Sequence, residues 1–195
     1  MKSNEGNGNT GLPEELERIL SGDVALEAER TLDQRIIDWN HERNGLKFNI
    51  DLEVKLLQEE SSEFMTANTL VERVQEFSDF LFVYTGTVAK YSAVTFNKAD
   101  SFQNLFQKMA EVQTWAEERM SMMSRMVVKE LELLRADEDQ INNILFGALK
   151  AVVEANEAKG TEKDENGKVV KGPDYVSPVT AIQTLIRDET GRFVQ

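Results

Sequence analysis

The 195-residue sequence has no cysteine and a single histidine, His41. Disulfides, thiolate zinc sites and cysteine nucleophiles are therefore excluded. Carboxylate di-iron sites in helical bundles usually add a Glu-x-x-His pair from each of two helices, which one histidine cannot supply. No apolar run approaches the roughly 20 residues of a membrane span, and the N-terminus lacks the apolar core of a signal peptide. We therefore expect no membrane association and a cytoplasmic location.

Positive charge is also scarce, since 22 Lys and Arg residues stand against 35 Asp and Glu residues. The net charge of −13 makes the surface repel phosphate backbones, so nucleic-acid binding is not expected. The same acidity suits a protein that collects hard divalent cations through carboxylate oxygens. With 41% hydrophobic and 29% charged residues, the composition is that of a globular chain.

The hydrophobic pattern predicts an all-α protein. Residues 1–11 are rich in Asn and Gly and are expected to be a disordered tail, followed by one all-α domain over 12–195. Thr69 and Glu72 form a capping box, and Asp137 and Gln140 resemble one. Helices are expected at about 13–21, from Asp23 to 44, and at 51–67, 69–91, 101–135 and 137–157, with a last short one from Ser177. We expect these helices to pack as a bundle.

Two segments depart from this regular pattern. The helix at 101–135 is about 50 Å long at 1.5 Å per residue, and it carries a stripe rich in methionine. Residues 159–177 form a polar, Gly-containing loop, in which Val169–Val170 is the one candidate for a short extended piece.

Two consecutive helices carry acids where apolar residues are expected. Glu60 and Glu63 fall on the apolar face of the helix at 51–67, while Glu76 and Asp79 border the apolar band of the next helix. Burying an unpaired carboxylate costs several kcal/mol, so such acids need a compensating cation. Antiparallel helices with acid pairs at i and i+3 can bring four carboxylates to one point. Oxygen ligands alone favour Mg²⁺, with Mn²⁺ as a substitute.

The spacing of these acids by itself favours a solvated face over a metal site. Glu-x-x-Glu also occurs at 14/17, 154/157 and 162/165 in this acid-rich chain. The placement on apolar faces, rather than the spacing, is what favours a metal site.

The acid pattern Glu59-Glu60-x-x-Glu63 followed by Glu76-x-x-Asp79 resembles the signature of the all-α nucleotide pyrophosphohydrolases. That superfamily includes MazG, phosphoribosyl-ATP pyrophosphohydrolase, dimeric dUTPases and dCTP pyrophosphatases. The segment from Asn156-x-x-Lys159 to Lys171-Gly-Pro-x-Tyr175 is similar to the C-terminal part of MazG-like proteins, many of them bacterial or phage-encoded.

The resemblance implies a role for each matching residue. Glu60, Glu63, Glu76 and Asp79 would bind Mg²⁺, and Glu59 or Glu63 would accept a proton from the attacking water. Five further residues would contact the nucleotide's sugar, phosphates or base: Asn156, Lys159, Lys168, Lys171 and Tyr175. Trp39 would stack on the base, although plain core packing explains an aromatic there equally well. Asn40 and Arg43 are weaker candidates.

The chain departs from compact members of the family in one respect. Asp79 and Asn156 are 77 residues apart, and the helix at 101–135 accounts for the excess. This inserted helix would extend the bundle, pair with another subunit or cover the site. The resemblance implies a homodimer or homotetramer.

The expected activity is Mg²⁺-dependent cleavage of a (d)NTP into the monophosphate and pyrophosphate. An alternative is a non-enzymatic helical interaction protein that uses the Met-rich helix as its partner surface. An acidic mimic of nucleic acid is a third reading, but a mimic displays its charge outward rather than on apolar faces.

Overall fold

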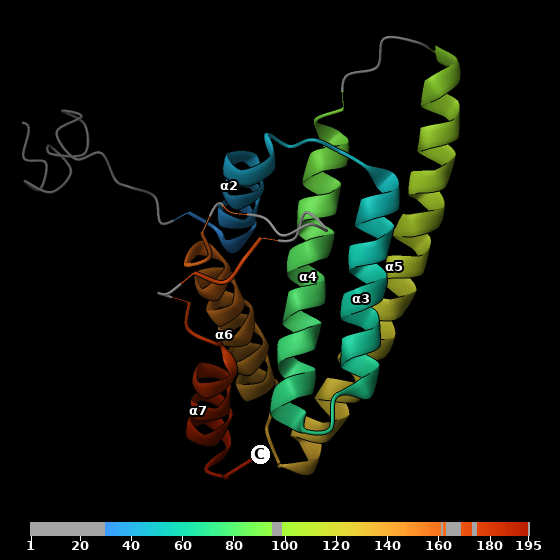
Figure 1. Cartoon of the computed structure of the whole chain (residues 1–195). Coiled ribbons are helices and arrows are strands. Elements are labelled where there is room, and N and C mark those ends of the chain that lie inside the picture. The colour runs from blue at the N-terminus through green and yellow to red at the C-terminus, as the bar shows by residue number, and fades with distance from the viewer. Residues whose placement is uncertain (1–29, 95–98, 161, 163–168, 173–174, 195) are drawn as a thin grey trace, which may run out of the picture. The chain divides into compact units, whose positions relative to one another are not determined.

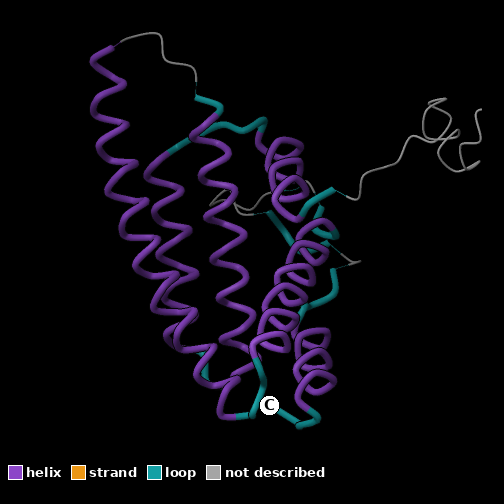
Figure 2. The backbone as a smooth tube through the Cα atoms, turned by 180° about the vertical axis from the view of Figure 1, so that it is seen from behind, coloured by secondary structure: helices purple, strands orange, loops and turns teal. Residues whose placement is uncertain are grey.

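The computed structural model describes residues 30–94, 99–160, 162, 169–172 and 175–194. The predicted tail at 1–11 and the predicted helix at 13–21 lie outside the described residues. Within the described part the chain is all-helical and contains no strand (Figures 1 and 2), as the sequence predicts. Its helices are α2 Leu32–Asn44, α3 Ile50–Thr66, α4 Leu70–Ser92, α5 Ala99–Leu133, α6 Glu138–Glu157 and α7 Val179–Thr190.

Helix α4 is the centre of the bundle. It contacts α3 and α5 on one side and α2, α6 and α7 on the other (Figure 1). The α3–α4 pair is antiparallel and joined by a short loop, which brings the acids of the two helices to the same level. Buried residues of α3 to α7 form the main core, which includes Leu57, Phe80, Met123, Ile144 and Ile182. A smaller cluster of Ile36, Phe82, Val152 and Val153 joins α2 to α4 and α6.

The helix ends follow local capping signals. Thr69 Oγ1 accepts a hydrogen bond from the Glu72 amide, and the Glu72 carboxylate accepts one from the Thr69 amide, which completes the predicted capping box. Asp137 and Gln140 form a second capping box at the start of α6. The sequence placed the start of the second helix wrongly at Asp23. Arg30 and Thr31 are not helical, and Thr31 caps α2 instead by accepting from the Gln34 amide.

The capping box at α4 gives a stability prediction. Thr69→Ala should lower the free energy of unfolding by about 1 kcal/mol, because the amides at the start of α4 lose a side-chain acceptor. Urea unfolding followed by circular dichroism measures the change. Thr114→Ala is the matched control, since Thr114 is exposed in the middle of α5 and caps nothing. Equal effects of the two substitutions would contradict this account of the cap.

The long helix α5 extends the bundle within the same chain. Met109, Met123 and Val127 are buried, and α5 packs against both α3 and α4. Arg73 on α4 pairs with Glu130 on α5 at 2.8 Å. Much of the methionine stripe is therefore covered inside the chain, although Phe106 and Leu133 stay 56% and 72% exposed. The homodimer or homotetramer stays a prediction.

Candidate functional site

Three carboxylates from α3 and α4 meet between the two helices. Each of Glu60, Glu63 and Glu76 offers an oxygen within 4.8 Å of the other two, and we call this group the carboxylate triad. Glu60 is 8% exposed, Glu76 is half-buried and Glu63 faces solvent. The spacing of three residues places Glu60 and Glu63 on one face of α3, and the antiparallel α4 presents Glu76 to it. The predicted convergence of these three acids is therefore observed.

The fourth predicted ligand, Asp79, lies beside the triad rather than within it. The Gln75 side-chain amide donates to Glu76 Oε1 and to Asp79 Oδ2, both at 3.3 Å, and so bridges the two acids. Asp79 and Glu60 line the same cavity. Glu59 is half-buried and belongs neither to the triad nor to the cavity wall.

The carboxyl group of Glu76 has a raised pKa. Burial raises its pKa to about 8, and the negative charges of Asp79 and Glu63 act in the same direction. A hydrogen bond with Glu63 further favours the protonated form. Close carboxylates at a half-buried position resist ionisation unless a cation offsets their charge. A cation at the triad would offset this charge.

A cavity of about 550 Å³ connects the acids with residues from the far end of the sequence. Glu60 and Asp79 contribute to its wall from α3 and α4, Trp39 comes from α2, and Asn156 and Lys159 come from the end of α6. Apolar side chains such as Leu56, Phe82 and Val83 complete the wall. A concave, mainly apolar space with a few converging polar groups is typical of a small-molecule site.

Asn156 and Lys159 lie together, as the Asn-x-x-Lys motif implies. Lys159 Nζ donates to Asn156 Oδ1 at 2.7 Å, while Asn156 Nδ2 donates to the Val152 carbonyl. The Lys159 and Lys171 ammonium groups lie 5.8 and 4.7 Å from the centre of the Tyr175 ring. These cations and Tyr175 form one cluster beside the cavity, although Lys171 and Tyr175 are not part of its wall. Lys168 lies outside the described residues.

Trp39 is fixed at the junction of α2 and α6. Its indole N–H donates to the Asn156 carbonyl at 2.7 Å, and Phe82 meets its ring edge-on at 5.2 Å. The Arg43 guanidinium lies 4.7 Å from the ring centre and also donates to the Lys159 carbonyl at 2.8 Å. Trp39 therefore packs on the smaller core and lines the cavity at once, so both interpretations of this residue fit its position.

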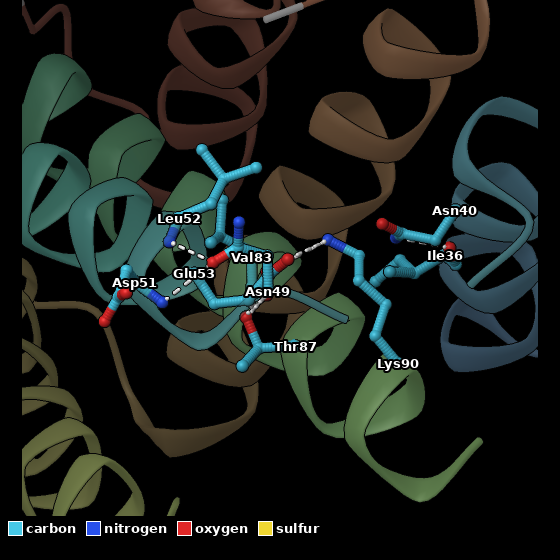
Figure 3. Close-up of polar contacts among 9 residues, drawn as sticks. All are labelled: Ile36, Asn40, Asn49, Asp51, Leu52, Glu53, Val83, Thr87 and Lys90. Atoms are coloured by element: carbon cyan, nitrogen blue, oxygen red, sulfur yellow. Dashed lines mark hydrogen bonds and ion pairs between the residues drawn. The ribbon is translucent and has the colours of Figure 1, made fainter. Parts of the chain in front are cut away.

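The sequence analysis missed a buried ion pair in the cavity wall (Figure 3). Lys90 Nζ lies 2.9 Å from both Oε1 and Oε2 of Glu53, and Thr87 Oγ1 donates to Oε2 at 2.9 Å. Glu53 is 1% exposed and Lys90 6%. A signal was present, since Glu53 is seven residues before Glu60 and so shares its face of α3.

In the described part of the chain no helix is both long and apolar enough to cross a bilayer. The resemblance to the all-α pyrophosphohydrolases rests on the motifs in this sequence. No protein family, curated protein or solved structure matches the chain.

Proposed function

We propose that this chain is a Mg²⁺-dependent nucleoside triphosphate pyrophosphohydrolase. One observation carries the proposal: a single cavity is lined by Glu60 of the carboxylate triad, by Asp79 beside the triad and by the Asn156–Lys159 pair. A cation site beside a lysine is what a polyphosphate needs, since both offset its negative charge. Trp39 in the same wall adds an aromatic surface for a base.

The residues present fit a hard divalent cation. The triad offers only carboxylate oxygens, which Mg²⁺ and Mn²⁺ prefer over softer metals. The raised pKa of Glu76 supports this fit, because burial and the negative charges of Asp79 and Glu63 both disfavour its ionised form, which a bound cation would stabilise. When bound, Mg²⁺ neutralises phosphate oxygens and lowers the pKa of a coordinated water.

The proposed reaction is hydrolysis of the bond between the α and β phosphates. Water attacks the α phosphorus, the bond from that phosphorus to the bridging oxygen breaks, and the bridging oxygen leaves with pyrophosphate. Glu63, the exposed member of the triad, accepts the water proton, and Glu59 is the second candidate for this role. Lys159 offsets charge that develops on the leaving pyrophosphate.

A nucleotide panel tests this proposal. Purified protein with Mg²⁺ should release pyrophosphate from at least one (d)NTP, and excess chelator should abolish the release. Coupled detection of pyrophosphate, with the monophosphate product resolved by ion-exchange chromatography, measures both products. Release of orthophosphate instead would exclude cleavage at the α phosphorus, and full activity in chelator would exclude the metal.

The alternative of a helical interaction protein draws on the exposed Phe106 and Leu133 of α5. Under this alternative, thermal stability should not change with Mg²⁺. A cation bound at the triad would instead stabilise the fold by RT ln(1+[L]/Kd). Thermal melting with and without Mg²⁺ separates the two proposals even before a substrate is found.

A further inference from the structure

The cavity has a second polar end that the proposed reaction does not use. Glu53, Lys90 and Asn40 all line it, and Figure 3 shows the Lys90 ammonium turned toward the Glu53 carboxylate. Glu53 and Glu60 share one face of α3 and are separated by two helical turns, or roughly 10 Å. That separation is comparable with the length of a nucleoside from its 5′ oxygen to the far edge of its base.

Lys90 is held in one position by Glu53 of α3, whose carboxylate also accepts a hydrogen bond from Thr87 of α4. Both oxygens of Glu53 lie within 2.9 Å of Nζ, and Thr87 fixes the carboxylate from the next turn of α4. An ammonium group has three donor hydrogens, and the Glu53 carboxylate takes at most two of them. One donor of Lys90 is thus available at the cavity wall, with its direction set by the ion pair.

Asn40, in the wall of the same cavity, supplies an acceptor. Its Nδ2 donates to the Ile36 carbonyl at 2.9 Å, which fixes the orientation of the amide because Oδ1 in that place would repel the carbonyl oxygen. Asn40 is only 3% exposed, and its amide packs on Gly86 of α4, one turn before Lys90. A Cβ at Gly86 would lie 2.6 Å from Asn40 Nδ2.

Gly86 lies in the middle of α4, where glycine is unfavourable. Glycine in the middle of a helix is less stable than alanine, yet α4 carries Gly86 at a buried position. Gly86 leaves the space that the Asn40 amide fills, one turn before Lys90. The Asn40 amide is thus placed against this part of α4 at a cost to local helix stability.

We propose that Lys90 and Asn40 recognise the base of the nucleotide and select bases with a carbonyl beside a ring N–H, as in guanine, uracil and thymine. This inference rests on the proposed function. Lys90 donates to the base carbonyl and Asn40 Oδ1 accepts from the ring N–H, while Glu53 and Thr87 are positioning residues for Lys90. In the same pose, adenine and cytosine turn an amino group toward the ammonium and a ring lone pair toward Oδ1, so both contacts are repulsive.

The test compares kcat/KM for dGTP, dUTP, dATP and dCTP with Mg²⁺. A site built from hydrogen-bonding groups rejects a mismatched base strongly, so the better of dGTP and dUTP should exceed both dATP and dCTP by about tenfold or more. Two variants should reduce this preference to about threefold or less: Gly86→Ala, which displaces Asn40, and the double variant Glu53→Leu/Lys90→Met. The double variant replaces the buried pair by apolar residues of similar size, which preserves packing.

The outcomes separate this inference from the proposed function. Hydrolysis of all four nucleotides at similar rates, or a preference for dATP or dCTP, overturns base selection by Lys90 and Asn40 and leaves the pyrophosphohydrolase standing. An equal loss for all four substrates in Gly86→Ala assigns that contact a structural role and also overturns the inference. If no nucleotide is hydrolysed, the proposed function fails, and thermal shifts with Mg²⁺ and each nucleotide then test base selection as binding. Lys55→Met is the matched control, since Lys55 is exposed on α3 and its loss should change nothing.

Discussion

Glu60→Gln is expected to lower kcat/KM for pyrophosphate release by at least about a hundredfold, the effect of removing one group that controls developing charge. Glu60 is the most buried member of the triad, and it is the one that also lines the cavity. Glutamine keeps the shape of the side chain but lacks the negative charge that holds a cation. The loss should therefore appear in both the reaction and the thermal stabilisation by Mg²⁺.

The control is Glu132→Gln, which removes one charge from an exposed position of α5. It should retain the activity and the Mg²⁺ response of the natural sequence. Circular dichroism establishes that both variants are folded. A Glu60→Gln protein that keeps more than a third of the activity would show that the triad is not the metal centre of this reaction.

Helix limits were predictable because their signals are local. The capping boxes at Thr69 and Asp137 involve residues three apart, and the apolar stripe of α5 is visible from its spacing alone. The same reasoning found Glu60, Glu63 and Glu76, since acids on an apolar face are unusual. The start of α2 was placed too early, at Asp23, whereas Thr31 accepts the capping hydrogen bond of this helix from the Gln34 amide.

The second end of the cavity was not predictable in this way. Glu53 shares the face of α3 that carries Glu60, but Lys90, 37 residues later, looks like an ordinary charged residue of an amphipathic helix. Only the antiparallel packing of α3 on α4 brings them together. Asn40 and Gly86 are also far apart in the sequence. Their contact depends on the absence of a Cβ at Gly86, and no sequence motif indicates it. Spacing along one helix cannot reveal such contacts between helices.

Mg²⁺ binding and protonation of Glu76 should oppose each other. The pKa of Glu76 rises from 4.5 to about 8 on folding, so between these values the folded chain holds a proton that the unfolded chain has released. Without Mg²⁺, stability is greatest below pH 4.5 as far as this group is concerned, and falls as the pH rises to about 8. The slope from one such proton is at most about 1.4 kcal/mol per pH unit.

Comparing the pH dependence of stability in the natural protein and in Glu76→Gln gives the contribution of Glu76. Glu76→Gln cannot ionise, so its unfolding free energy without Mg²⁺ should fall less steeply from pH 5 to pH 8, while the exposed control Glu118→Gln should follow the natural sequence. Because Mg²⁺ binds the ionised carboxylate, its affinity for the natural protein should rise with pH, by at most about tenfold per unit, and level off near pH 8. Urea unfolding and titration calorimetry measure the two quantities. Identical pH slopes in Glu76→Gln and the natural protein would mean that Glu76 carries no extra proton at neutral pH. A cation at the triad would then not act by offsetting the cost of ionising Glu76.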